Sequence, residues 1–135
     1  MRGEGRENRK RNMNEKVKSY KDLVVWQKRV TLVKRVYQLT RSFPAHEKFG
    51  WVSQMRRAAV SVPSNLAAGH ARNTTGGFIQ FISHAAGSLA ELETQVILAV
   101  ELAFCPPADL QPLHGVIGEI QKMANALRRT LTSRG

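Results

Sequence analysis

Residues 73–104, with the sequence NTTGGFIQFISHAAGSLAELETQVILAVELAF, form the longest amphipathic stretch of the chain. Apolar side chains recur there mostly in steps of three and four, the spacing of one face of an α-helix. They are Phe78, Ile82, Ala85, Leu89, Leu92, Val96 and Ala103. Asn73, Thr74 and Thr75 precede them and are suitable N-caps. Roughly 27 residues at the α-helical rise would span about 40 Å, so the stretch predicts one long helix.

Three more amphipathic segments occur, and helix-breaking residues separate them. The first begins near Ser19 and ends before Pro44, and Pro106 precedes the last. The second contains Pro63, which should kink or interrupt it. Their apolar faces are Leu23, Trp26, Val30, Val33 and Tyr37 in the first; Val52, Met55, Ala59, Val62 and Leu66 in the second; and Leu110, Leu113, Ile117, Ile120, Ala124, Leu127 and Leu131 in the last.

The pattern predicts an all-α fold. No stretch alternates with the period of two that half-buried strands show. Four amphipathic helices with short connections predict an antiparallel up-and-down four-helix bundle over residues 19–135. Residues 1–18 contain only Met1, Met13 and Val17 as apolar side chains, so we expect a disordered basic tail. Met13 is a candidate for an alternative start site.

Composition favours a cytoplasmic protein. No run of about 18 apolar residues is present that could span a membrane. The polar N-terminus lacks the apolar core of a secretory signal. The single cysteine, Cys105, cannot form an internal disulfide, which suits a reducing compartment. Its apolar neighbours indicate a partly buried, hydrophobic side chain.

Charge is the strongest compositional signal. The chain has 21 Lys and Arg against 10 Asp and Glu, a formal net charge of +11, which attracts polyanions whatever the fold. The first nineteen residues hold an excess of four positive charges, and the rest of the chain holds an excess of seven. The candidate nucleic-acid-binding residues are Lys21, Lys28, Arg35, Arg56, Arg57, Arg72, Lys122 and Arg129. Acids of the long helix are alternative, structural partners for Arg56 and Arg57.

Several of these cations are regularly spaced along the expected helices. Lys21, Lys28 and Arg35 are spaced by seven residues, and so are Lys122 and Arg129. Each set therefore forms a stripe, which we expect to lie opposite the core face of its helix. Such stripes could follow a phosphate backbone. Solvated basic faces with no ligand would give the same pattern.

Two of the expected helices carry a second apolar stripe. At about 100° per residue, the second stripes lie roughly 100–120° from the faces that contain Trp26 and Phe78. One interpretation is a wide arc that faces the core. The other is a subunit interface, because two exposed stripes would make an apolar patch unusual for a monomer. The candidate interface residues are Val25, Leu32, Val36 and Leu39 in the first segment, and Ile79, Ala86, Ala90 and Ile97 in the third.

No catalytic centre, metal site or cofactor site is predicted. The four histidines are scattered, and no cysteine pair or metalloprotease motif occurs. Glu91 and Glu93 are two residues apart on a helix, so they point to different faces. Gly76-Gly77 lacks the further glycines and the lysine of a phosphate-binding loop. We therefore expect a protein without enzymatic activity.

A specific motif string runs through the chain from Tyr20 onward. It consists of residues 20–27 (YKDLVVWQ), 37–40 (YQLT), 43–44 (FP), Glu47, 53–67 (SQMRRAAVSVPSNLA), Gly69, Arg72 and 87–92 (GSLAEL). This string resembles the four-helix-bundle family of ribosomal intervening-sequence proteins. The founding members of that family are encoded inside insertions of large-subunit ribosomal RNA genes.

The resemblance implies an up-and-down bundle, often a homopentameric ring, with no established enzymatic activity. The similar, strongly basic accessory protein of diversity-generating retroelements shares this form and binds a reverse transcriptase and RNA. The high positive charge here resembles that branch. We therefore expect a basic, oligomeric, nucleic-acid-binding accessory protein whose partners are itself, RNA or DNA, and a reverse transcriptase. The alternative is a structural scaffold or protein-interaction bundle with no nucleic-acid role.

The chain departs from the family pattern at Ala68, where an acidic residue usually precedes the glycine after the Asn-Leu-Ala motif. Without that carboxylate, the two adjacent arginines of the motif could bind an anion or remain solvated. The other motif residues look structural. Asn65 could satisfy carbonyls that the proline leaves free, and Gly69 and Gly87 would allow helices to approach closely.

Overall fold

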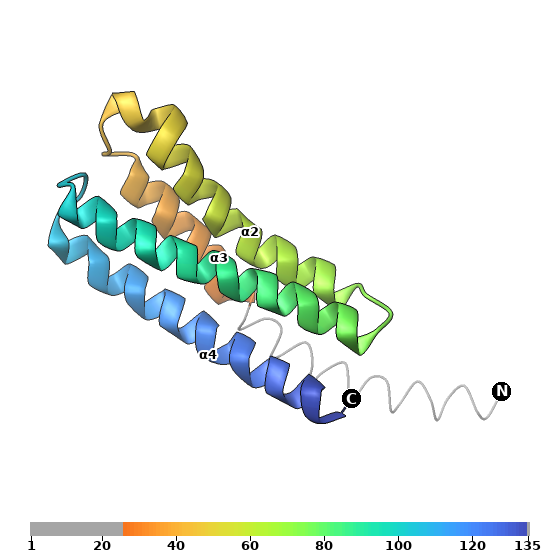
Figure 1. Cartoon of the computed structure of the whole chain (residues 1–135). Coiled ribbons are helices and arrows are strands. Elements are labelled where there is room, and N and C mark those ends of the chain that lie inside the picture. Colours follow the sequence, from red (N-terminus) through yellow and green to blue (C-terminus); the bar gives the residue numbers. More distant parts are fainter. Residues whose placement is uncertain (1–25, 135) are drawn as a thin grey trace, which may run out of the picture.

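The computed structural model describes residues 26–134, and within this part four helices are joined by short turns. The first helix covers residues 26–40. It is followed by α2 (Ser53–His70), α3 (Thr75–Glu101) and α4 (Leu110–Arg134). Successive helices run antiparallel and side by side (Figure 1). The described residues contain no strand, so the predicted all-α, up-and-down four-helix bundle is confirmed.

The core runs along the axis of the bundle, and every helix contributes to it. Its largest fully buried side chains are Leu32, Val36, Met55, Val62, Ile82, Leu89, Leu92, Val96, Ile117 and Ile120. All five apolar residues predicted for the second segment are buried. In α4 the predicted face is mostly buried, but Leu127 is 37% exposed. The predicted tail over residues 1–18 lies outside the described residues.

The first helix turns its second apolar stripe to the core, and not the predicted face. Leu32 and Val36 are 0% exposed, whereas Trp26 and Tyr37 are 51% and 38% exposed. The two stripes are similarly apolar, but indole and phenol side chains carry polar atoms that tolerate a surface position. Branched aliphatic side chains fill the interior instead.

Both ends of α3 are closed by hydrogen bonds that its sequence provides. The Thr74 hydroxyl accepts from the Gly77 backbone N–H at 3.1 Å, which confirms the predicted N-cap. At the other end, Ala103 adopts φ 60°. The Ala103 N–H donates to the Val100 carbonyl at 3.0 Å, and the Phe104 N–H donates to the Ala99 carbonyl at 2.9 Å. This is a Schellman motif. Ala103 therefore lies beyond the end of the helix, and its predicted place on the apolar face was wrong.

Pro63 does not interrupt α2, which continues to His70. The ring of a proline deprives the carbonyl four residues earlier, here that of Ala59, of its usual backbone donor. The Asn65 side-chain amide donates to the Ser61 carbonyl at 2.7 Å. Asn65 therefore does not reach the freed carbonyl of Ala59, and the role predicted for its side chain was wrong.

The two glycines expected to allow close helix approach differ. A Cβ at Gly69 would lie 2.8 Å from Cβ of Phe81 and 3.3 Å from Cδ1 of Phe78. Gly69 thus permits the contact of α2 with α3, as predicted. A Cβ at Gly87 would have no neighbour within 4 Å, so the prediction for Gly87 was wrong.

Candidate nucleic-acid interface

Positive charge in the described part of the chain is concentrated in residues 26–57, which we call the basic hairpin. It comprises the first helix, the connection to α2 and the first turn of α2 (Figure 1). It contains eight Lys and Arg and a single acid, Glu47, whereas residues 58–134 contain five of each sign. The cations of the basic hairpin are Lys28, Arg29, Lys34, Arg35, Arg41, Lys48, Arg56 and Arg57. The excess of seven charges therefore belongs to one hairpin.

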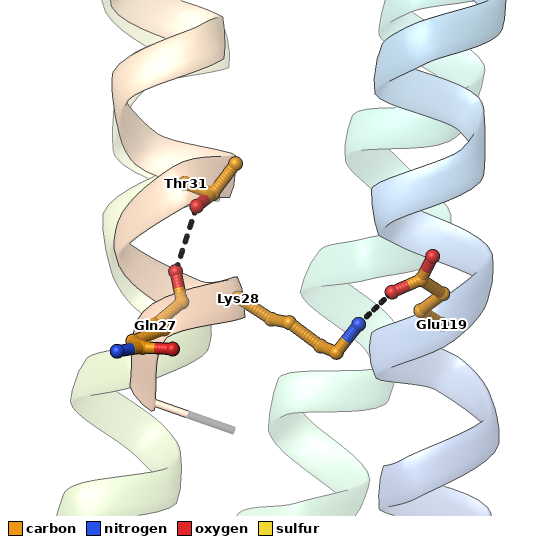
Figure 2. Close-up of polar contacts among 4 residues, drawn as sticks. All are labelled: Gln27, Lys28, Thr31 and Glu119. Carbon is orange, nitrogen blue, oxygen red and sulfur yellow. Dashed lines mark hydrogen bonds and ion pairs between the residues drawn. The ribbon is translucent and has the colours of Figure 1, made fainter. Parts of the chain in front are cut away.

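The predicted stripe on the first helix does not lie opposite its core face. Lys28 and Arg35 flank the buried face on the side of α4. Figure 2 shows Lys28 reaching from the first helix to Glu119 of α4, with which it forms an ion pair. Both side chains of the pair are partly exposed, so the pair contributes little to stability, about 0–1 kcal/mol. It neutralises one of the candidate cations.

Lys34 and Arg41 are exposed cations that were not among the predicted binding residues. Lys34 lies roughly opposite the Leu32 and Val36 face at about 100° per residue, and Arg41 is exposed one residue beyond the end of the helix. They are spaced by seven residues, the same signal that selected Lys28 and Arg35. Had the Leu32 and Val36 face been assigned to the core, the same spacing would have predicted Lys34 and Arg41. Within residues 26–134, no ion pair holds either of them.

Arg56 has a structural role within the basic hairpin. Its Nε donates to the Thr40 hydroxyl at 2.9 Å, and its guanidinium lies 4.4 Å from the centre of the Tyr37 ring. The Thr40 hydroxyl in turn donates to the Val36 carbonyl at 2.7 Å. Arg57, the next residue, is exposed. In the described part of the chain, neither arginine pairs with an acid of α3, so the alternative ion pairs are not formed.

The remaining candidate cations lie on the neutral part of the bundle. Arg72 follows α2, and its guanidinium lies 4.6 Å from the centre of the Phe81 ring. Lys122 and Arg129 are exposed on α4, away from its buried face, as predicted. Lys21 lies outside the described residues. These cations are therefore separate from the basic hairpin.

The candidate interface residues divide between the core and the surface. Leu32, Val36 and Leu39 are at most 9% exposed and belong to the core of the chain itself, so their assignment to a subunit interface is corrected. Their burial supports the wide core arc for the first helix. On α3, Ile79 and Ala86 are half-buried, whereas Ala90 is exposed and Ile97 is 41% exposed. Val25 lies outside the described residues.

Two depressions in the surface of the described residues border the first helix or the segment that precedes α4. One depression of about 210 Å³ lies between the first helix and the start of α4, with Arg35 and Asp109 in its lining. A second is lined by Ser42, Cys105 and Asp109. Burial raises the pKa of the Cys105 thiol, and the negative charge of Asp109 raises it further. The thiol is therefore protonated at neutral pH, which makes it a poor nucleophile.

No group of three or more His, Cys, Asp or Glu in residues 26–134 is placed to hold a metal ion. In the same part of the chain, no helix combines the length and apolar character needed to cross a membrane.

A known protein structure has the same fold as this chain. A crystal structure of a protein of unknown function from the S23 ribosomal protein family of Bacteroides thetaiotaomicron superimposes with a TM-score of 0.73. The two sequences are 20% identical, and the match covers 81% of this chain and 98% of the other. No curated protein matches significantly. The family model described as 23S rRNA-intervening sequence protein matches residues 21–126, and the chain therefore belongs to this family.

Proposed function

We propose that this chain is a non-enzymatic, cytoplasmic accessory protein that binds nucleic acid, RNA in particular, through its basic hairpin. The supporting observation is the segregation of charge: an excess of seven positive charges in residues 26–57 and none in residues 58–134. Charge that serves only solubility does not need to be concentrated in one segment of the chain. A concentrated positive surface, in contrast, raises the local concentration of a polyanion and speeds its association.

The contacts would be made mainly with phosphates. Lys34, Arg35, Arg41, Lys48 and Arg57 are all exposed. Within residues 26–134 none of them is held in an ion pair. Each cation that neutralises a phosphate releases counterions, so the affinity should fall with salt by roughly 0.7–0.9 log units per log unit of salt for each contact.

Assembly into a closed homo-oligomer, with five chains as the expected number, is the second part of the proposal. Four large hydrophobic residues are between 38% and 51% exposed: Trp26 and Tyr37 on the first helix, and Ile97 and Leu98 on α3. Contiguous exposed apolar patches commonly mark contact surfaces, and we propose that these side chains contribute to such a patch. An oligomer would repeat the basic hairpin in each subunit and make weak phosphate contacts multivalent. Light scattering that gave a monomer at micromolar concentration would contradict this part.

A reverse transcriptase is the proposed protein partner, by similarity to the accessory protein of diversity-generating retroelements. A reverse-transcriptase gene beside the gene for this chain would support this partner. Co-expression of the two proteins followed by purification through a tag on one of them would test it. Failure of the two proteins to co-purify would leave nucleic acid as the remaining proposed partner.

The experiment that tests nucleic-acid binding compares two triple variants with the same loss of charge. The first, Lys34→Gln, Arg41→Gln and Arg57→Gln, changes the basic hairpin. The second changes Arg72, Lys122 and Arg129 to Gln and serves as the matched control. Both sets are exposed, so circular dichroism should show an intact fold. Anisotropy of a labelled RNA across a salt series gives the affinity and its salt slope.

The hairpin variant should bind more weakly than the control and show a salt slope reduced by up to about 2. Equal effects of the two variants would indicate that only net charge matters. No binding by the unmodified chain at low salt would favour the alternative, a scaffold without a nucleic-acid role. One observation favours that alternative: Lys28 uses its charge for an ion pair within the bundle.

A further inference from the structure

The connection between the first helix and α2 holds one aromatic side chain out in solvent. It consists of a 3₁₀ turn, η1 (Ala45–Glu47), and a π-helical segment, η2 (Lys48–Val52). Phe49, in this segment, is 90% exposed, whereas no other large hydrophobic residue in the described chain exceeds 54%. Burying a phenylalanine stabilises a fold by about 1.5–3 kcal/mol, and this position gives up that contribution.

The segment that carries Phe49 is anchored on both sides of it. Trp51 packs against Phe104, with ring centroids 6.2 Å apart, and Phe104 contacts Phe43 at 5.6 Å. The Glu47 carboxylate accepts a hydrogen bond from the Trp51 backbone N–H at 3.4 Å. The turn is thus tied to the bundle by its other aromatic residues. The exposed position of Phe49 follows from an anchored turn and not from a loose one.

The surroundings of Phe49 are positively charged. Nζ of Lys48 lies 5.7 Å from the centre of the Phe49 ring. Both residues belong to the basic hairpin, which contains eight cations and one acid. The carboxylate of that acid, Glu47, is directed to the backbone of its own turn. A flat apolar ring beside a cation is the combination that proteins use to stack a base and contact its phosphate.

We infer that Phe49 is a stacking platform for an unpaired base, and that Lys48 contacts the phosphate next to that base. The ligand is therefore a single-stranded segment of nucleic acid. This inference rests on the nucleic-acid-binding function proposed above. A paired duplex hides its base faces within its own stack, so a ring at a turn reaches only unstacked bases. The charge excess of the hairpin favours a polyanion over an apolar peptide as the occupant.

The test uses the full chain with two fluorescein-labelled probes, a single-stranded oligouridine of about 12 nucleotides and an RNA duplex of the same length. Phe49→Leu removes the ring and keeps an apolar side chain, and Phe49→Trp restores a stacking surface. Phe49→Leu should weaken binding of the single strand by roughly 5- to 100-fold. Phe49→Trp should restore it. Binding of the duplex should stay within about twofold for both variants.

The salt dependence separates stacking from charge. Phe49→Leu should leave the salt slope unchanged, because no phosphate contact is lost. Lys48→Gln should reduce the slope by about 0.7 for the single strand. The melting temperature of each variant checks the fold, and the 90% exposure of Phe49 predicts that it will not change.

Three results would overturn the inference. The first is wild-type affinity of Phe49→Leu for the single strand. The second is an equal loss for the single strand and the duplex. The third is a smaller assembly of Phe49→Leu in light scattering, which would assign the ring to a contact between copies of the chain. In each of these cases the unmodified chain still binds, so the proposed function stands; absence of binding by the unmodified chain would refute both.

Discussion

Gly69 and Gly87 should respond to the same substitution with opposite signs. Alanine in place of a helical glycine stabilises by about 0.5–1 kcal/mol, because glycine loses more backbone freedom on folding. At Gly87 the new Cβ meets no atom within 4 Å, so Gly87→Ala should show this gain in full. At Gly69 the new Cβ would lie 2.8 Å from Cβ of Phe81. Overpacking costs about 1–3 kcal/mol, so Gly69→Ala should be destabilising by about 1–2 kcal/mol net.

Urea unfolding followed by circular dichroism measures both effects. The variants and the wild type are compared at one protein concentration, because the stability of an assembled chain depends on it. The urea midpoint should rise for Gly87→Ala and fall for Gly69→Ala, with similar slopes. A midpoint for Gly69→Ala at or above that of the wild type would refute the close approach of α2 to α3. A loss of stability at Gly87 that appears only in the assembled protein would place this position in a subunit contact.

Three further substitutions or measurements test local features. Ala103 adopts φ 60°, a conformation that costs about 1–2 kcal/mol for a residue with a Cβ. Ala103→Gly should therefore raise the free energy of unfolding by about 0.5–1 kcal/mol, once the larger backbone entropy of unfolded glycine is subtracted. A lower urea midpoint would contradict this. Gln95 is 7% exposed, its Oε1 has no hydrogen-bond partner, and its Nε2 donates at 3.3 Å to the carboxylate of the exposed Glu91. Gln95→Leu should therefore stabilise by about 1 kcal/mol, because the exposed Glu91 can bind water instead; a lower melting temperature would contradict this. The raised pKa of Cys105 predicts slower reaction with a disulfide reagent in the folded than in the urea-unfolded chain. It also predicts that the associated stability is present below the unfolded pKa and is lost as the pH rises through the folded pKa.

The sequence predicted the helices well because their ends carry local signals. The Thr74 cap and the two prolines before α4 act within a few residues, so no tertiary information is needed to interpret them. The 27-residue length of α3 agrees with the length expected from its apolar repeat. Pro63 was misleading because a proline removes one hydrogen bond, and α2 tolerates that loss where its buried face holds it against α3.

The candidate site was harder to predict because it depends on which face of the first helix is buried. The Trp26 and Leu32 stripes have the same period and similar apolar character, so periodicity cannot rank them. The choice is made by neighbouring helices, which sequence spacing does not reveal. Because the wrong face was assigned to the core, Lys28 and Arg35 were predicted to point outward, and Lys34 was not predicted as a binding residue. Phe49 was overlooked because exposure of a lone aromatic residue leaves no periodic signal.

The contacts that hold the basic hairpin together leave most of its charge in place. Arg56 joins the first helix to α2 through a neutral hydroxyl and the face of the Tyr37 ring, so no carboxylate cancels its charge. Lys48 lies against the Phe49 ring in the same way. Cation–π contacts of this kind stabilise by about 0.5–1 kcal/mol at exposed sites, comparable with a surface ion pair. An acidic partner would provide similar stability but would remove the positive field, so the aromatic partners preserve the field on which the proposed binding of a polyanion depends.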